Sequence, residues 1–307
     1  MKKLILLTLS IFSLYAGELA GKVPLASKDI ASNHGGDLLV SSQMITNILD
    51  YQKFGELFTY LQVHYFKVIF LVILVGVPLA FLLHYLLIGA KHFIHGGKRI
   101  YFFTLFNRIT HWVAAIAFVV LIPTGLMMVF GKYLGGGAPI RIARELHGYF
   151  TPVFIVSVIP MLFSWLKNML PSLDDIKWMF IVGGYLSKKK KEIPAGKFNA
   201  GQKMWFWVAT LGGIVMILTG GTMFFENFDF GIAKAFGMTQ IDLLRLAAII
   251  HNILGFAVLA LFITHIYMSV FAIKGSLQSM KDGYKSEDEV KYMHSSFYKK
   301  LQKEGKI

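Results

Sequence analysis

The sequence IHNILGFAVLALFITHIYMSVFAIK, residues 250–274, decides the fold of this chain. It is long and apolar enough to cross a bilayer as one helix, and it carries two histidines, His251 and His265. Their spacing of fourteen residues is nearly four turns, or about 21 Å of helix at ~3.6 residues per turn and ~1.5 Å per residue. The two imidazoles therefore share one helix face at different membrane depths. Because a histidine inside lipid is costly and marks a functional site by default, this stripe predicts two stacked metal centres.

The composition of the whole chain agrees with a membrane protein. Its 307 residues are 55% hydrophobic, and its mean hydropathy of +0.59 is too high for an ordinary soluble domain. Cysteine is absent, which excludes disulfides, cysteine-held iron–sulfur clusters and covalently attached haem. The net charge of +14 is best explained by basic loops on the cytoplasmic side, so we expect the lipid bilayer and no nucleic acid as a partner.

The order of apolar segments predicts an all-α integral membrane protein with five mature spans. Residues 1–16 have the two lysines, short apolar core and terminal alanine of a signal peptide, and the alternative is an uncleaved anchor. A periplasmic segment, 17–66, precedes a first span within 67–90, whose apolar core is 68–88. The other four spans, near 109–130, 147–166, 204–225 and 250–274, form one helical domain over 101–274, and a polar tail follows at 275–307. Between the third and fourth spans we expect an amphipathic helix on the membrane surface, in the sequence DDIKWMFIVGGYL.

Charge asymmetry fixes the orientation of these spans. Segments 91–108, 167–203 and 274–307 contain 20 lysines and arginines, whereas 17–67, 132–146 and 225–245 contain 9. By the positive-inside rule the first set is cytoplasmic. The mature N-terminus is then periplasmic and the C-terminus cytoplasmic, as the signal peptide also requires.

This orientation sorts four histidines into two pairs by depth. His111 and His265 lie toward the cytoplasmic side, and His147 and His251 lie toward the periplasmic side. Each pair joins two different helices, as is needed to clamp a flat macrocycle from both faces. Zinc usually takes three or four protein ligands, whereas two imidazoles suit six-coordinate haem iron. Gly125, fourteen residues after His111, could leave room for a porphyrin edge or could serve only close helix packing.

The remaining histidines and the cationic span ends are weaker candidates. His84, inside the first span, could border the inner site or simply pack. We expect the others to be solvated: His34, His64, His92, His95 and His294. Cations at span ends could pair with haem propionates or act only as interfacial anchors: Arg108, Arg141, Arg144, Lys203 and Lys274.

Three motifs, GKFNAGQKMWFW at 196–207, NRITHW at 107–112 and the two-histidine helix, together resemble the cytochrome b (gamma) subunit of respiratory formate dehydrogenases, a di-haem membrane family. The resemblance covers roughly 101–300. It implies a four-helix di-haem core, to which this chain adds one N-terminal span. It also implies that His147 and His251 hold the periplasmic haem b iron and that His111 and His265 hold the cytoplasmic one. Asn199, Gly201 and Gln202 match the loop lining a menaquinone pocket, although Asn-Ala-Gly is also ordinary turn chemistry before a helix.

The resemblance further implies a place in anaerobic respiration. Electrons would arrive from a periplasmic iron–sulfur subunit, cross the bacterial inner membrane through two b haems, and reduce menaquinone near the cytoplasmic side. Formate would be oxidised on a separate molybdenum or tungsten subunit, so this chain would be the quinone-reducing subunit of the enzyme, and the complexes could assemble further. Two alternatives remain open: a cytochrome b for a hydrogenase or another periplasmic oxidoreductase, and a non-redox transporter or anchor.

Overall fold

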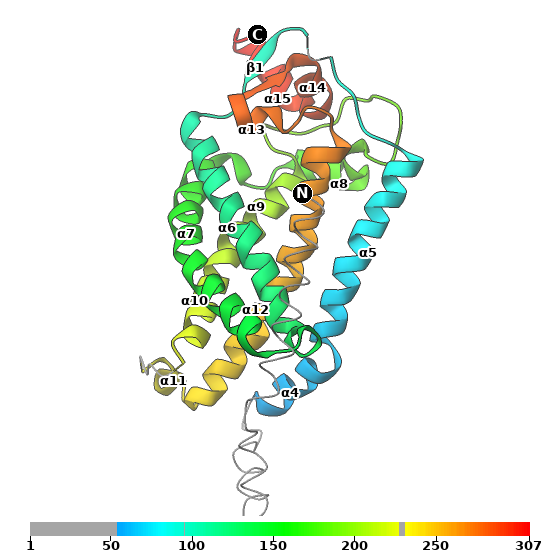
Figure 1. The fold of residues 1–307 in the computed structure, drawn as a ribbon. Helices are drawn as coiled ribbons and strands as arrows, with labels where there is room; N and C mark the ends of the chain where they lie inside the picture. Colours follow the sequence, from blue (N-terminus) through cyan, green and yellow to red (C-terminus); the bar gives the residue numbers. More distant parts are fainter. Residues whose placement is uncertain (1–53, 95, 227–230) are drawn as a thin grey trace, which may run out of the picture. The chain divides into compact units, whose positions relative to one another are not determined.

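The computed structural model describes residues 54–94, 96–226 and 231–307 (Figure 1). The expected signal peptide and most of the expected periplasmic segment lie outside these residues. Within them, five helical stretches are long and apolar enough to cross a membrane, namely Gly55–Leu87, Leu105–Val129, Gly137–Met169, Ala200–Phe224 and Gln240–Ala272. The prediction of an all-α integral membrane protein with five spans is confirmed.

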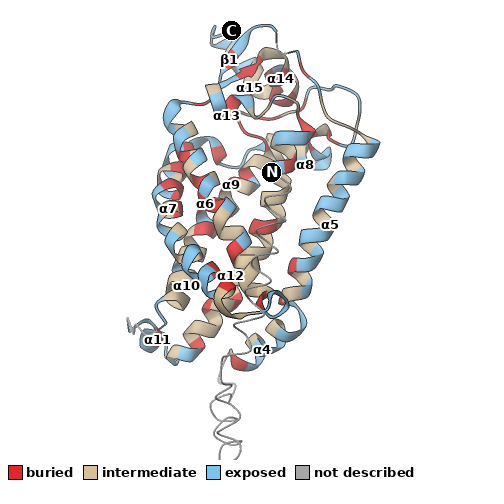
Figure 2. Cartoon of the chain, viewed as in Figure 1, coloured by how far each residue is buried: buried red, intermediate tan, exposed pale blue. Residues whose placement is uncertain are grey.

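The first stretch combines helices α4 (Gly55–His64) and α5 (Phe66–Leu87). Most residues of α5 are exposed or only half-buried, although the helix is strongly apolar (Figure 2). An apolar surface of this kind is stable against lipid rather than against water. Pro78 lies inside α5 without ending it.

The second and third stretches are α6 (Leu105–Val129) and α7 (Gly137–Met169), with the short helix η1 (Gly131–Leu134) between them. Helix α7 begins ten residues before the predicted span. Three consecutive glycines, 135–137, all have positive φ and form the turn. Pro139 then falls in the first turn of α7, where a missing N–H is tolerated.

The fourth stretch contains α9 (Ala200–Trp207), the π-helical turn η3 (Val208–Gly212) and α10 (Gly213–Phe224). After α11 (Ile232–Ala235), the fifth stretch contains α12 (Gln240–Ile266) and the π-helical turn η4 (Tyr267–Ala272). Helix α12 also begins ten residues earlier than predicted. The reason is a capping box, because Thr239 Oγ1 accepts from the Asp242 backbone N–H at 3.2 Å and the Asp242 carboxylate accepts from Thr239 N at 3.3 Å.

The chain divides into two compact units, and the four candidate histidines divide with them. The first unit is Met1–Ile69, Val119–Pro152 and Leu218–Asn252; it holds His147 and His251. The second unit is Phe70–Phe118, Val153–Ile217 and Ile253–Ile307; it holds His111 and His265. Each predicted pair therefore lies within a single unit.

The second unit includes a folded assembly of loops that we call the cap, residues 91–104, 184–199 and 273–307. Strand β1 (Arg99–Tyr101) pairs antiparallel with β2 (Tyr284–Ser286). Three short helices, α13 (Gln278–Asp282), α14 (Glu287–Met293) and α15 (Ser295–Lys303), lie beside this pair (Figure 1). The amphipathic helix predicted between the third and fourth spans is α8 (Leu173–Phe180), followed by the turn η2 (Val182–Gly184).

The cap has its own apolar core, which the sequence did not predict. Phe102, Phe103, Phe198 and Val290 are buried together with residues of α7 and α9. Backbone hydrogen bonds join loop 193–195 to residues 292–297, for example Ile193 N to Tyr292 O at 2.7 Å. The polar tail predicted at 275–307 is therefore folded, because its irregularly spaced apolar residues pack against two distant loops.

Candidate functional site

The first pair of histidines, His147 on α7 and His251 on α12, is brought together as predicted. Their ring centres are 6.3 Å apart, with planes inclined at 60°. Two imidazoles that share one metal ion at ~2.0 Å bonds, with each ring centre ~1.2 Å behind its nitrogen, have ring centres about 6.4 Å apart. The pair has the separation of two axial ligands.

A threonine beside each ring was not anticipated. Thr124 Oγ1 lies 3.0 Å from His147 Nδ1, and Thr219 Oγ1 lies 3.0 Å from His251 Nδ1. The Thr124 hydroxyl already donates to the carbonyl of Val120 at 2.7 Å, so toward the histidine it acts as an acceptor. This arrangement places the proton of His147 on Nδ1 and leaves the Nε2 lone pair for a metal.

A glycine follows each of these threonines, so the sequence Thr-Gly occurs once on α6 and once on α10. A Cβ on Gly125 would lie 3.3 Å from His147 Cε1, and a Cβ on Gly220 would lie 3.2 Å from His251 Cε1. Both glycines therefore let a helix backbone approach an imidazole closely. The sequence pointed to Gly125 through its spacing from His111, but Gly220 could have been found only by noticing the repeated Thr-Gly.

Two other glycines that might have cleared space have ordinary packing roles. A Cβ on Gly148 would meet the Phe224 ring at 2.4 Å. A Cβ on Gly255 would meet the Phe70 ring at 3.1 Å. The absence of a side chain at Gly148 and Gly255 leaves space for the Phe224 and Phe70 rings to pack against the helices.

The second pair, His111 on α6 and His265 on α12, has similar geometry. Its ring centres are 6.1 Å apart and its planes are inclined at 57°. The Trp205 indole stacks on His265 with a centroid distance of 5.6 Å, and Nδ1 of His111 is buried without a hydrogen-bond partner in the described residues. A buried ring nitrogen without a hydrogen-bond partner is unfavourable in a protein interior. Its presence here is consistent with a prosthetic group bound between His111 and His265.

The donor set of the two histidine pairs differs from that of an ordinary zinc site, which has three or four protein ligands. Within the described residues, no group of three or more His, Cys, Asp or Glu side chains converges. Two histidines on facing helices leave four equatorial positions to another ligand, as a porphyrin supplies. The residues present thus fit two bis-histidine haem sites, with His147 and His251 in one and His111 and His265 in the other.

The loop predicted to contact quinone is ordered by a capping box. Asn199 Oδ1 accepts from Gln202 N and Gln202 Oε1 accepts from Asn199 N, each at 3.0 Å. Both side-chain oxygens are therefore engaged, and only the amide N–H₂ groups could donate to a ligand. Gly201 lies against Trp178, since a Cβ there would be 3.0 Å from the indole.

A buried ion pair anchors the same loop. Lys203 Nζ lies 2.7 Å from Asp175 Oδ2 and 3.2 Å from Ser172 Oγ, so α9 is tied to α8. The other carboxylate oxygen, Asp175 Oδ1, and the indole nitrogen of Trp178 are both buried without a partner in the described residues. Lys203 is therefore committed to Asp175 rather than free for a propionate.

The other cations at span ends, and His84, differ in the partners that they contact. Arg144 lies 3.5 Å from Glu226, whereas Arg108, three residues before His111, bonds the Lys281 carbonyl and keeps a buried, unpaired Nε. Both ring nitrogens of His84 have hydrogen-bond partners in the protein. Nδ1 lies 2.5 Å from the Tyr267 hydroxyl and Nε2 lies 2.9 Å from the Tyr185 carbonyl, so His84 has a structural role.

The expectation that His294 is solvated is wrong. His294 is 2% exposed, and its Nδ1 lies 3.0 Å from the Gly196 carbonyl. His64 and His92 are exposed as expected, and His34 and His95 lie outside the described residues.

Comparison with known proteins places this geometry in a family. A family model described as prokaryotic cytochrome b561 matches residues 102–283. The nitrate-inducible formate dehydrogenase cytochrome b556(Fdn) subunit of Escherichia coli K12 is 29% identical over 202 residues, which are 64% of this chain and 89% of that protein. The formate dehydrogenase cytochrome b556(fdo) subunit of the same strain is 27% identical over 205 residues, covering 66% and 92% of the two chains. The formate dehydrogenase cytochrome b556 subunit of Haemophilus influenzae is 27% identical over 197 residues, covering 62% and 79%.

The family match covers more than half of the chain and contains all four paired histidines. The part before residue 102, including α5, lies outside the match. Five apolar helices, two facing histidine pairs and this match lead to one conclusion: the chain is an integral membrane protein of the prokaryotic cytochrome b561 family.

Proposed function

We propose that this chain is the cytochrome b subunit of a formate dehydrogenase complex, which passes electrons from a periplasmic iron–sulfur subunit through two b haems to menaquinone near the cytoplasmic side. The observation that carries the proposal is the pair of matching histidine arrangements, with ring-centre distances of 6.3 and 6.1 Å. The names of the relatives, all formate dehydrogenase subunits, supply the complex. Formate oxidation would occur on a separate molybdenum or tungsten subunit.

In each site this chain supplies both axial ligands and their orientation. A bound haem b would accept and release one electron, and two histidine ligands would leave no open position for oxygen. Thr124 and Thr219 orient His147 and His251, while Trp205 packs on His265. Arg108, whose Nε is buried and unpaired, is the best placed cation for a propionate.

Orientation in the bacterial inner membrane follows from charge. The cap contains most of the lysines of the cytoplasmic set, whereas the connections on the other side are poor in them. We therefore assign the cap to the cytoplasm and the mature N-terminus to the periplasm. The same assignment puts His111 and His265 on the quinone-reducing side.

Haem content and activity of histidine variants test the core of this proposal. The purified wild-type chain should contain two b haems by the pyridine haemochrome assay. His265→Ala should retain one haem and lose menaquinone reduction by formate in the complex, while formate oxidation with an artificial acceptor continues. His92→Ala, at an exposed position, is the matched control and should retain both. Normal quinone turnover in the His265→Ala complex would disprove the electron route.

The quinone site is placed by proposal at Asn199, Gly201 and Gln202. Its test separates capping from ligand binding, because Asn199→Asp and Gln202→Glu keep the oxygens that form the capping box and remove the amide donors. The negative charge that each variant adds lies at the N-terminus of α9, where the helix dipole stabilises it. We expect both variants to keep their thermal stability and haem content and to lose quinone reductase activity. Unchanged quinone kinetics in both would show that these residues only cap α9.

A further inference from the structure

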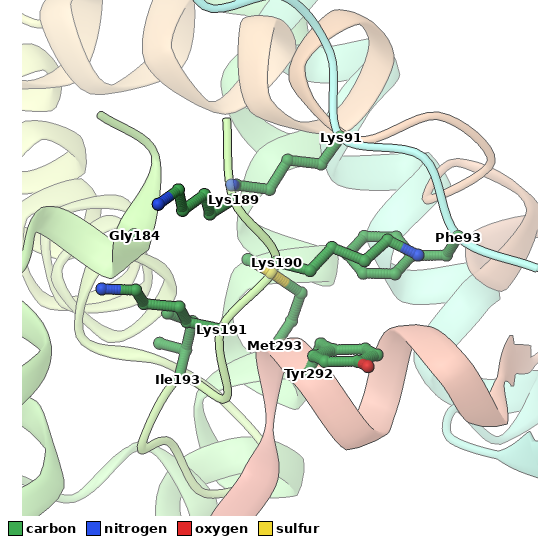
Figure 3. A pocket seen from close by; sticks show the side chains of 9 residues that line it. All are labelled: Lys91, Phe93, Gly184, Lys189, Lys190, Lys191, Ile193, Tyr292 and Met293. Atoms are coloured by element: carbon green, nitrogen blue, oxygen red, sulfur yellow. The ribbon is translucent and has the colours of Figure 1, made fainter. Parts of the chain in front are cut away.

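A small basic pocket lies on the cap, apart from the histidine pairs and the quinone loop. Four lysines, Lys91, Lys189, Lys190 and Lys191, line it together with Phe93 and Tyr292 (Figure 3). Nothing in the proposed electron route uses these residues. The four lysines come from two segments far apart in sequence, so the fold brings these charges together.

The pocket lies at the level where two membrane helices end. Lys91 follows the end of α5 at Leu87 by four residues, and its backbone is hydrogen-bonded to the end of η4: Lys91 N donates to Ala272 O at 2.8 Å, and Lys274 N donates to Lys91 O at 3.0 Å. The Lys91 ammonium group donates to the Ser187 carbonyl at 2.9 Å and so holds the lysine-rich loop against this helix end. Partial burial lowers the pKa of Lys91.

The positive charge of the pocket is only partly compensated. Lys190 lies 3.1 Å from Asp288 and sits over the rings of Phe93 and Tyr292. Glu192 forms a salt bridge with Lys299 at 2.9 Å. Among the described residues, no acidic side chain pairs with Lys91, Lys189 or Lys191, and the ammonium groups of Lys189 and Lys191 point away from Phe93 and Tyr292 (Figure 3).

Exposed apolar side chains lie close to these lysines in the sequence. Leu87, Ile94 and Leu186 are 60%, 69% and 65% exposed. Helix α8, which leads through η2 into the pocket, also exposes an apolar face, with Phe180 86% exposed. Such residues are stable at the boundary of a bilayer, where lysines can reach phosphates while neighbouring side chains enter the acyl region.

We propose that the exposed lysines around this pocket bind the phosphate of an anionic phospholipid headgroup of the adjacent leaflet. Lys189 and Lys191 contact the phosphate, Lys190 is held in place by Asp288, and Leu87, Ile94 and Leu186 contact the acyl chains. A free phosphate ion would meet the same lysines, but it would make no use of the apolar residues. Lipid binding would fix the lysine loop, and with it the start of the segment that leads to α9.

Native mass spectrometry of the full haem-containing chain tests this proposal. The chain is delipidated in detergent and titrated with phosphatidylglycerol or phosphatidylcholine of identical acyl chains. The variant is Lys189→Gln/Lys191→Gln, and the matched control is Lys300→Gln/Lys303→Gln, which removes the same charge from exposed positions on α15. Equal haem content in all three proteins shows that they are folded.

We expect wild type and control to prefer phosphatidylglycerol, and the pocket variant to bind it about 30-fold more weakly, at ~1 kcal/mol per lysine near an anionic surface. Equal binding of the two lipids by wild type, or equal losses in the variant and the control, would overturn the proposal. The last measurement is a competition with glycerol 3-phosphate. Displacement of the lipid by millimolar glycerol 3-phosphate would assign the pocket to soluble phosphates instead, and the absence of displacement supports the lipid.

Discussion

At the scale of single residues, the proposed haem site at His147 and His251 depends on atoms that would not contact the metal. The hydroxyl of Thr124 both donates to its own helix and accepts from His147, which selects one tautomer of a ligand. Hydrogen bonds of this kind orient metal-binding histidines and raise their basicity. The two Thr-Gly sequences thus orient the imidazole rings, and the spacing of the histidines sets the depth of each ring in the membrane.

Thr124→Val should weaken one haem and spare the other. Valine keeps the volume of threonine but removes the acceptor, and losing such a partner typically reduces metal affinity by about 10- to 100-fold. A haem titration of the purified variant should show one weakened site. Thr124→Ser, which retains the hydroxyl, should behave as wild type, and two unaltered sites in the valine variant would contradict the tautomer argument.

Gly220→Ala should disturb the His147–His251 site through a steric contact rather than through a lost hydrogen bond. The new Cβ would lie 3.2 Å from His251 Cε1, so the imidazole must shift by a few tenths of an ångström. We expect a changed reduction potential or partial loss of one haem in a redox titration. Gly221→Ala is the neighbouring control, because its Cβ would meet nothing within 4 Å; similar effects in both variants would point to helix packing instead.

At the scale of elements, the structure explains why predicted boundaries were less accurate than predicted spans. Hydropathy identified the apolar cores of all five stretches, because lipid requires long apolar helices. It missed the first ten residues of α7 and of α12, where charged residues interrupt the apolar sequence. Local signals were present in both cases, three glycines before Pro139 and the Thr239–Asp242 capping box.

The contact between α8 and α9 should depend on the buried pair Lys203–Asp175. Lys203→Met leaves an uncompensated carboxylate, and breaking one partner of a buried pair costs about 3–5 kcal/mol. The side chains here are 9% and 13% exposed, so we expect the lower end, seen as a reduced melting temperature. The double variant Lys203→Met/Asp175→Asn should recover much of the loss; no recovery would mean that the lysine acts through packing alone.

At the scale of the whole molecule, the sequence predicted the membrane fold and the histidine pairs, but it did not predict the cap. Helical periodicity relates residues on one helix face, so fourteen-residue spacings could be interpreted directly. The cap is made from contacts between loops distant in sequence, which no local pattern encodes. Phe102, Phe198 and Val290 therefore looked like scattered apolar residues, and His294 like a solvated one.

The stability of the protein should fall as pH decreases below neutrality because of His294. Burial, with a contribution from nearby Lys285, lowers the pKa of His294 to about 3, whereas the unfolded side chain titrates near 6.5. Below pH ~6.5 the His294 side chain is protonated in the unfolded state but remains neutral in the folded state. The free energy of unfolding therefore decreases by up to ~1.4 kcal/mol per pH unit until the folded pKa is reached.

Hydrogen exchange of the cap amides between pH 7 and pH 5, corrected for intrinsic rates, measures this effect. His294→Gln should flatten the pH dependence relative to wild type. Identical profiles for the two proteins would show that His294 accepts its proton within the fold.

The cap also sets the order in which the molecule can be completed. Its core joins residues near 100 and 198 to Val290, and loop 193–195 bonds to residues 292–297. The cap therefore cannot form until residues 290–297 have left the ribosome. Until then Phe102, Phe103 and Phe198 lack their C-terminal cover, although the helices before them can already have inserted. Premature termination or clipping near residue 290 would leave an aromatic surface open to proteases and chaperones. Residues 290–297 thus shield this aromatic surface from solvent once they have folded onto it.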